Sequence, residues 1–351
     1  MLAQKIDKLK KQFETESFLF ASRTETFYLT GADFDGFWIL AFKNSVYAIC
    51  PKMIENQVRE YFSNRKVQIY TGIPMSLAVC EILKNAGIKE VAADLNYMNA
   101  AEFLLIKDKL GAENIKLDTK SGILDELRFV KSESEITNIK EACRIVSKVC
   151  MTVKKELKPG LSELDIHYRI LELFAKNKVK ESFTPIVAAG RNSANPHHAS
   201  SNYKIKANDI VMTDIGCIYK GYCSDLTRTY FLGKINDKFR RVWDIVKAAQ
   251  TAVLKDLKAG LPIRAADKAA RDVIEAAGYG GKFIHTTGHG VGIEIHEMPS
   301  LAKNAEGVFL KGMTVTAEPG IYLENEFGVR IEDTVLITKD GCKILTSAAY
   351  E

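Results

Sequence analysis

The sequence predicts an α+β protein of two domains, a smaller α/β domain over residues 1–126 and a larger one over residues 127–351. Helical and strand-like patterns alternate through the first 126 residues, without a phosphate-binding loop or a nucleophile elbow. After residue 127, a pattern of two helices and two acidic strands occurs twice. A chain of 351 residues is also long for one hydrophobic core, so two domains are expected.

Composition places the chain among globular proteins, since 46% of residues are hydrophobic and 26% are charged. The net charge of +5 is spread along the chain without a basic block, so no nucleic-acid partner is expected. No apolar run reaches about 18 residues and no apolar leader follows Met1, which predicts a cytoplasmic protein without a membrane partner. Seven cysteines without a CxxC motif indicate reduced thiols.

The smaller domain is expected to form an α/β layer with no recognisable chemistry of its own. Its predicted helices cover Ala3–Phe13, Met75–Ala86 and Ala100–Leu110. Its predicted strands cover Ser17–Leu29, Gly36–Cys50 and Val91–Asp94.

The larger domain opens at Ser132, which Glu135 follows in the Ser-x-x-Glu pattern of a helix capping box. This helix is expected to end near Leu157, and a second helix is expected over Ser162–Lys176.

The same order returns about one hundred residues later. The segment LKPGL at 157–161 reappears as LKAGL at 257–261, again between two helices. A β-rich stretch with an acidic residue, and then a second acidic strand, follow each second helix. Two similar halves that meet at a shared acidic interface are therefore predicted. The four acids are Asp214, Asp225, Glu318 and Glu332.

A hairpin over residues 209–233 brings two of these acids together. Its β-rich runs are joined at Tyr219-Lys220-Gly221, with Asp214 and Asp225 in the middle of the runs. A two-residue loop would put both carboxylates on one face of the ribbon. Like charges across a strand pair destabilise a sheet, so a cation is expected between them. A buried Lys or Arg and a hard metal ion both satisfy this expectation.

Five of the six histidines fall in two segments rich in Gly, Asn and Pro, whereas His167 lies on a predicted helix. A single loop histidine is usually a satisfied polar residue, but five of them beside four repeated acids indicate a site. The five are His197, His198, His285, His289 and His296.

The segments MTDIG, SDLTRT, TGHGVGIEIHE, TAEPG and GVRIEDT, in this order and spacing, resemble the metallopeptidase family of prolidase, aminopeptidase P and methionine aminopeptidase. The resemblance covers about Leu127 to Leu345 and implies a pita-bread fold with an internal pseudo-twofold repeat. The N-terminal part, with Tyr28-Leu29-Thr30-Gly31, resembles the creatinase-like domain of the proline-directed members. The Asp-x-Arg-Tyr motif often found there is absent, and Pro51-Lys52-Met53 stands in its place.

By position, the resemblance implies five metal ligands, Asp214, Asp225, His289, Glu318 and Glu332. Four carboxylates balance two divalent cations, and a bridging hydroxide between the cations is the implied nucleophile. A carboxylate-rich set with one imidazole favours Mn²⁺, with Zn²⁺, Co²⁺ and Fe²⁺ as alternatives. The resemblance implies that Asp225 and Glu332 bridge the ions, that Asp214 completes one shell, and that His289 with Glu318 completes the other.

The resemblance also implies catalytic roles. Glu318 is the candidate for moving the water's proton to the leaving nitrogen. His197, His285 and His296 are candidates for holding the carbonyl oxygen and the tetrahedral intermediate. His197 is preferred over His198, which is expected to be a loop histidine, because His197 directly follows a proline as in the family motif.

The implied substrate is a peptide or dipeptide with proline at its second position. Arg330 is expected to line the substrate pocket, with an ion pair to a nearby acid as the alternative. Prolidases often carry Arg after the His-Glu-x-Pro turn, where this chain has Ser300. An Xaa-Pro aminopeptidase is therefore expected, and an Xaa-Pro dipeptidase, with Arg330 or Arg191 binding the free carboxylate, is the alternative.

Two further hypotheses share the fold. One is a peptide-binding module without catalysis, and the other is a metal-free amidinohydrolase of the creatinase type. Both predict degenerate ligand positions, whereas all five positions hold the family's residues. The resemblance also implies a homodimer.

Overall fold

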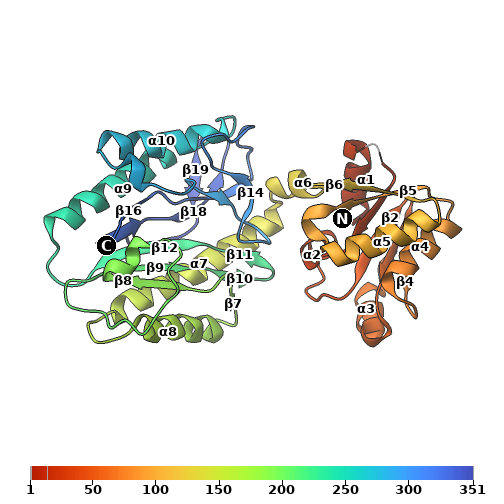
Figure 1. The fold of residues 1–351 in the computed structure, drawn as a ribbon, viewed down its shortest axis with the longest axis horizontal. Helices are drawn as coiled ribbons and strands as arrows, with labels where there is room; N and C mark the ends of the chain where they lie inside the picture. The colour runs from red at the N-terminus through yellow and green to blue at the C-terminus, as the bar shows by residue number, and fades with distance from the viewer. Residues whose placement is uncertain (1, 14, 351) are drawn as a thin grey trace. The chain divides into compact units, whose positions relative to one another are not determined.

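The computed structural model describes residues 2–13 and 15–350, and it divides the chain into two compact units, Met1–Leu127 and Arg128–Glu351 (Figure 1). The first unit contains a six-stranded sheet in the order β4-β3-β2-β1-β5-β6. The strands are β1 (Ser17–Phe20), β2 (Trp38–Phe42), β3 (Ser45–Ile49), β4 (Gln68–Tyr70), β5 (Glu90–Asp94) and β6 (Lys116–Lys120). The helices are α1 (Leu2–Phe13), α2 (Arg23–Thr30), α3 (Glu55–Phe62), α4 (Met75–Asn85) and α5 (Ala100–Ala112). Helix α6 (Asp125–Phe129) spans the boundary between the units.

The strand predicted over Ser17–Leu29 is wrong in its second half, where α2 forms instead. Ser22 accepts a hydrogen bond from the Glu25 backbone N–H at 3.1 Å, and the Glu25 carboxylate accepts one from the Ser22 N–H at 3.0 Å. Gly31 ends the helix in the left-handed region, at φ 78°. This capping box and glycine stop outweigh the aromatic, β-favouring composition of the segment. The strand predicted over residues 36–50 is a hairpin of β2 and β3.

The second unit contains two helix pairs and a set of short sheets. In Figure 1, α8 lies on one side of the unit and α9 and α10 lie on the other, with β9, β12, β16 and β18 between them. The main helices are α7 (Glu133–Glu156), α8 (Glu163–Lys176), α9 (Asp237–Asp256) and α10 (Ile263–Ala276). Strands of the first half are β7 (Lys180–Glu181), β8 (Ile186–Ala189), β9 (Ile210–Ile215), β10 (Cys217–Tyr219), β11 (Tyr222–Cys223) and β12 (Leu226–Phe231). Strands of the second half are β13 (His289–Gly290), β14 (Glu297–Ser300), β15 (Thr314–Ala317), β16 (Gly320–Leu323), β17 (Phe327–Arg330), β18 (Asp333–Ile337) and β19 (Cys342–Ile344).

The two halves of this unit repeat the same backbone hydrogen bonds, which confirms the predicted internal repeat. The Gly160 N–H donates to the Ile205 carbonyl at 2.9 Å, and the Gly260 N–H donates to the Phe309 carbonyl at 2.8 Å. In each half a bond in the reverse direction, also 2.9 Å long, closes the pair. The loop after the first helix is therefore docked in the same way in both halves.

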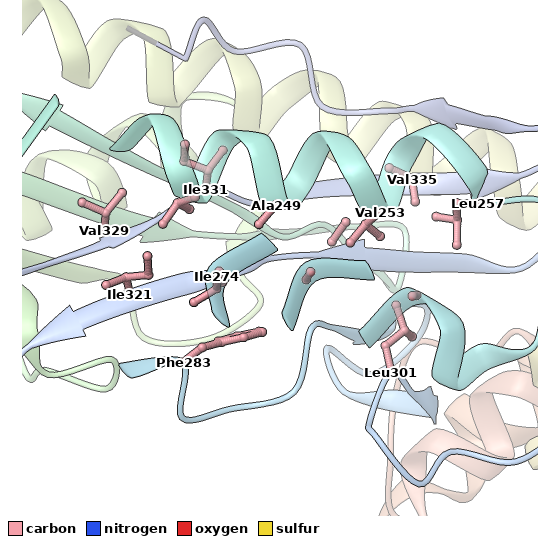
Figure 2. Close-up of a cluster of buried hydrophobic side chains, with 14 of the residues drawn as sticks. Ala249, Val253, Leu257, Ile274, Phe283, Leu301, Ile321, Val329, Ile331 and Val335 are labelled. Carbon is pink, nitrogen blue, oxygen red and sulfur yellow. The ribbon is translucent and has the colours of Figure 1, made fainter. Parts of the chain in front are cut away.

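Each half has its own hydrophobic core beneath its helix pair. Figure 2 shows one of them, in which Ala249 and Val253 of α9, and Leu257 directly after the helix, lie beside strands that carry Val329 and Val335. The spacing of four residues places Ala249 and Val253 on one face of α9. A second cluster packs α7 and α8 against β8, β9 and β12. These cores fix the strands whose ends carry the acidic residues.

Two further predictions concern the whole chain. All seven cysteines are free thiols, as predicted. Among the residues that the structure describes, no helix combines the length and the apolar character needed to cross a bilayer.

A buried ion pair joins the halves behind the acidic strands. Arg228 is 1% exposed, and its guanidinium donates to the Asp333 carboxylate at 2.8 Å and to the Glu332 carbonyl at 2.6 Å. The Asp333 carboxylate also accepts hydrogen bonds from Gln250 at 2.9 Å and from Tyr350 at 2.8 Å. The backbone before β18 is thereby tied to β12.

Removing one partner of this pair should destabilise the second unit strongly, because a buried charge is left without compensation. Asp333→Ala is expected to lower the free energy of unfolding by about 3–5 kcal/mol. Asp272→Ala, which breaks the exposed pair with Lys268 on α10, should cost about 0.5 kcal/mol or less. Urea unfolding in the presence of a chelator measures both variants, and equal losses would contradict the role of the buried pair.

Candidate metal centre

The four repeated acids lie at equivalent strand ends in the two halves. Asp214 lies one residue before the end of β9, and Asp225 directly precedes β12. Glu318 directly follows β15, and Glu332 directly precedes β18. The Glu332 N–H donates to the Thr227 carbonyl at 3.2 Å, so the two acidic segments are joined side by side.

The predicted hairpin carries both of its acids on one face. The turn is the two-residue loop Lys220–Gly221, with φ 46° and 80°, values typical of a tight hairpin turn with the right-handed strand twist. The register continues without a shift into β9 and β12, where Asp214 pairs with Thr227. Asp225 is two residues from Thr227 along the chain, so strand parity places it on the same face as Asp214.

His289 completes the cluster from the second half. Potential ligand atoms of Asp225, His289 and Glu332 all lie within 4.8 Å of one another. The His289 Nε2 lies 3.5 Å from an Asp225 carboxylate oxygen and 3.3 Å from a Glu318 oxygen. Its Nδ1 lies 3.0 Å from the Gly290 carbonyl. Donation from Nδ1 to this carbonyl leaves Nε2 as the nitrogen that faces the carboxylates.

The carboxylates repel one another and are short of partners. Burial, followed by the neighbouring charges of Glu332 and Asp214, raises the pKa of Asp225 well above its ordinary value. Burial and the charge of Glu318 likewise raise the pKa of Glu332. One buried carboxylate oxygen of Asp214 and one of Asp225 have no hydrogen-bond partner in the described part of the chain. This donor set fits divalent cations, which would neutralise the charge and occupy these oxygens.

Glu318 differs from the other acids because it lies against the imidazole. Burial raises its pKa, but the hydrogen bond and charge of His289 outweigh burial and lower the pKa of Glu318 to about 2. Burial also lowers the pKa of His289, while its contacts with Glu318 leave that pKa above the ordinary value. Glu318 is therefore an ionised carboxylate within the cluster.

One cavity of about 840 Å³ is lined by all the predicted metal ligands, by the predicted site histidines and by Arg330, but not by Arg191. All six histidines of the chain line it, together with the four acids and Arg330. Phe183, Ile295 and Met298 supply apolar wall. The predicted site residues that line the cavity are His197, Asp214, Asp225, His285, His289, His296, Glu318, Arg330 and Glu332.

Arg330 lines the cavity and also forms the ion pair that was the alternative prediction. Its guanidinium donates to the Asp214 carboxylate at 2.6 Å and to the Tyr322 hydroxyl at 2.8 Å. Burial raises the pKa of Tyr322 to about 12, so the phenol keeps its proton and can donate to His285 Nε2 at 2.8 Å. The Nδ1 of His285 lies 2.7 Å from the Thr286 carbonyl, so both ring nitrogens of this histidine are engaged.

The glycines of the His289 segment allow close packing against the backbone of neighbouring strands. A Cβ on Gly288 would lie 2.2 Å from the Thr316 carbonyl oxygen, and one on Gly290 would lie 2.4 Å from the Met298 carbonyl oxygen. These glycines let β13 fit between β14 and β15.

Sequence reasoning missed His167, Tyr322 and the partner of His198. His167 projects from α8, and its Nδ1 lies 2.9 Å from the Pro185 carbonyl. His198 lies in a loop as expected, but its Nε2 is 2.8 Å from the buried carboxylate of Glu163. Apart from the repeat, which makes His167 the counterpart of Asp267, no pattern in the sequence marks these contacts.

Residues 137–339 match the sequence model of Metallopeptidase family M24, and residues 3–130 match that of the Creatinase/Prolidase N-terminal domain. The chain is 38% identical over 274 residues to a Xaa-Pro dipeptidase of Pyrococcus furiosus, covering 78% of this chain and 77% of the relative. It matches the structure of a Xaa-Pro dipeptidase from Bacillus anthracis with a TM-score of 0.95 at 32% identity, over 100% of this chain and 99% of the other. It matches an X-Pro aminopeptidase from Thermotoga maritima with a TM-score of 0.89 at 28% identity, over 98% and 99%. These matches confirm the predicted pita-bread fold preceded by a creatinase-like domain.

The raised pKa values of Asp225 and Glu332 predict how the metal-free protein responds to pH. Below the ordinary carboxyl pKa of about 4, both carboxyl groups make their full contribution to the free energy of unfolding. This contribution is lost as the pH rises through the raised pKa values that the two groups have in the folded protein. Asp225→Asn removes one of the charges, so this variant should become more stable than the unsubstituted protein, by a margin that grows from pH 4 to pH 8.

Urea unfolding with a chelator measures that margin, and a divalent cation should reverse its sign at pH 8. The reversal is expected because the cation stabilises only the ionised, fully liganded form. A margin that stays constant across this pH range would show that the carboxylates do not repel one another in the folded chain.

Proposed function

The chain is a member of metallopeptidase family M24, and from that premise we propose that it is a dinuclear Xaa-Pro dipeptidase. The observation that carries this proposal is the gathering of four carboxylates and one imidazole on a single cavity, with buried carboxylate oxygens that lack partners. A non-catalytic binding module has no need for a cluster of such electrostatic cost.

We propose that Asp214, Asp225, His289, Glu318 and Glu332 would hold two divalent cations, with Asp225 and Glu332 serving as ligands for both. The positions of the acids support this assignment, because one member of each repeated pair precedes a strand at the junction of the halves. Mn²⁺ suits the carboxylate-rich set best, and Zn²⁺, Co²⁺ and Fe²⁺ are alternatives.

When bound, the cations lower the pKa of a water and polarise the scissile carbonyl. Glu318 is ionised, because His289 lowers its pKa to about 2, so it can take a proton from the water and pass it to the leaving nitrogen. Arg330 pairs with one Asp214 oxygen at 2.6 Å and leaves the other oxygen free to act as a ligand.

The histidines divide into two groups in this proposal. The ring nitrogens of His197 and His296 make no hydrogen bond to the described part of the chain, so they are free to hold the substrate carbonyl and the tetrahedral intermediate. Both ring nitrogens of His285 are hydrogen-bonded, one to the Thr286 carbonyl and one to the Tyr322 hydroxyl. His285 therefore orients the hydrogen-bond network that runs through Tyr322 to Arg330.

Selectivity for proline follows from the apolar wall and from the amide itself. The bond before proline has no N–H, so the site loses no hydrogen bond to that nitrogen. Phe183, Ile295 and Met298 offer an apolar surface to the ring.

The dipeptidase assignment takes the alternative of the sequence analysis over its first expectation, because relatives that match most of the chain are named Xaa-Pro dipeptidase. Xaa-Pro aminopeptidase is the second candidate. Ser300 supports it, and so does Arg330, whose guanidinium is already engaged by Asp214 and Tyr322. Arg191 is not among the residues that line the cavity.

Substrate length separates these two candidates. Protein loaded with Mn²⁺ is expected to hydrolyse the dipeptide Ala-Pro with a higher kcat/KM than Ala-Pro-Ala or the amidated dipeptide, because a dipeptidase uses the free carboxylate. The reverse order would identify an aminopeptidase. The release of no product from any Xaa-Pro peptide by metal-loaded protein would refute both.

Asp225→Asn provides the matched control, because it keeps the shape of the side chain and removes its charge. Its kcat/KM is expected to fall by more than about 100-fold, beyond the range typical of residues that only support ligands. Circular dichroism checks that the variant is folded. Unchanged activity in a folded variant would show that Asp225 is not a ligand of the metal centre.

A further inference from the structure

We propose that Glu163 and Asp267 are positioning residues, each of which fixes the segment carrying one active-site histidine, His197 and His285 respectively. Both carboxylates are 0% exposed, and neither lines the metal cavity. Each lies on the second helix of one half, Glu163 on α8 and Asp267 on α10. The inference rests on the proposed function for the roles of these histidines, His197 at the substrate and His285 in the network that ends at Arg330.

Glu163 gathers five hydrogen bonds from one loop. Its carboxylate accepts from the Ala189 N–H at 2.7 Å and from the Asn192 side chain at 2.9 Å. It also accepts from the Ser201 N–H at 2.9 Å and the Ser201 hydroxyl at 2.6 Å. The fifth donor is His198 Nε2 at 2.8 Å. One buried carboxylate thus collects four residues spread over 189–201.

His197 lies between these attachment points. Ala189 and Asn192 precede it and Ser201 follows it, so Glu163 holds the loop on both sides of the histidine. Burial raises the pKa of Glu163, but the hydrogen bonds, led by that from Ser201, outweigh burial and lower it. The bonds are therefore made to an ionised carboxylate, and such bonds are about twice as strong as neutral ones.

Asp267 does the same for the other histidine through an arginine. Its carboxylate accepts from the Thr287 hydroxyl at 2.9 Å and from Arg271 Nε at 2.6 Å. Arg271 in turn donates to the Phe283 carbonyl at 3.1 Å and to the His285 carbonyl at 2.7 Å. The segment 283–287 is therefore held before, at and after His285.

The two carboxylates do not lie at equivalent positions of the repeat. Glu163 is the first residue of α8, whereas Asp267 is the fifth residue of α10. The residue of α8 that corresponds to Asp267 is His167, which lies against the Pro185 carbonyl. In both halves the second helix supplies the carboxylate. Because Glu163 and Asp267 hold different segments, the effect of each on its own histidine can be tested separately.

Crossed double substitutions test this separation. Glu163→Gln and Asp267→Asn should each lower kcat/KM for Ala-Pro by about 10- to 100-fold, the loss expected when a group of the active site moves by roughly 1 Å. Glu163→Gln should have little further effect in a His197→Ala background and its full effect in a His285→Ala background. Asp267→Asn should show the opposite pattern.

Hydrogen–deuterium exchange on the metal-free protein gives a readout that does not depend on activity. Glu163→Gln should speed exchange in residues 189–201 but not in 283–287, and Asp267→Asn should do the reverse. If this pattern is observed while no Xaa-Pro peptide is hydrolysed, the proposed function fails and the anchoring of the two segments stands. If the pattern is not observed, the inference fails whatever the activity.

Milder variants cover the case in which the carboxyl substitutions prevent folding. Ser201→Ala removes one donor to Glu163, and Thr287→Val removes the hydroxyl donor to Asp267 without changing side-chain shape. Each should reproduce the selective pattern with a smaller change. Glu25→Gln, at a buried carboxylate of the first unit, is the control and should leave kcat/KM unchanged. Equal losses in both histidine backgrounds would overturn the proposal and leave Glu163 and Asp267 as general stabilisers.

Discussion

The mutual repulsion of four carboxylates is the constraint on which the second unit depends. Asp214, Asp225, Glu318 and Glu332 converge because each half of the repeat delivers one pair of acids to the same junction. Within the described part of the chain, Arg330 is the one guanidinium that lines their cavity, and it compensates one charge of four. Burial and, after it, this repulsion raise the pKa values of Asp225 and Glu332. Divalent cations would neutralise the negative charge that Arg330 does not compensate.

The remainder of the second unit holds the four acids in place against that repulsion. Two hydrophobic cores fix the strands, and the acids lie at the ends of those strands. The buried pair of Arg228 and Asp333 ties the backbone at Glu332 to β12. The same arrangement, a buried carboxylate that gathers distant backbone, recurs at Glu163 and Asp267. Buried charged groups of this unit therefore fix the positions of the backbone segments around the site, and the close packing of the cores keeps those positions rigid.

The parts that could be predicted from the sequence are those governed by local periodicity. Strand parity places Asp214 and Asp225 on one face, and the repeat adds the second acidic pair. Most other contacts between residues far apart in the chain could not be predicted. The bond between His198 and Glu163, and the choice of Asp214 as the acid that pairs with Arg330, depend on how loops return to helices and strands. In α2 the capping box visible in the sequence is the better guide, and the aromatic, β-favouring composition, which predicts a strand, is the worse one.

Anomalous diffraction from crystals soaked in Mn²⁺ tests whether the acids of the two halves together hold two ions. Two peaks per chain are expected, both within coordination distance of Asp225 and Glu332, with one beside Asp214 and the other beside His289 and Glu318. A single peak, or two peaks that do not share Asp225 and Glu332, would contradict the claim that the paired acids of the two halves form one dinuclear centre.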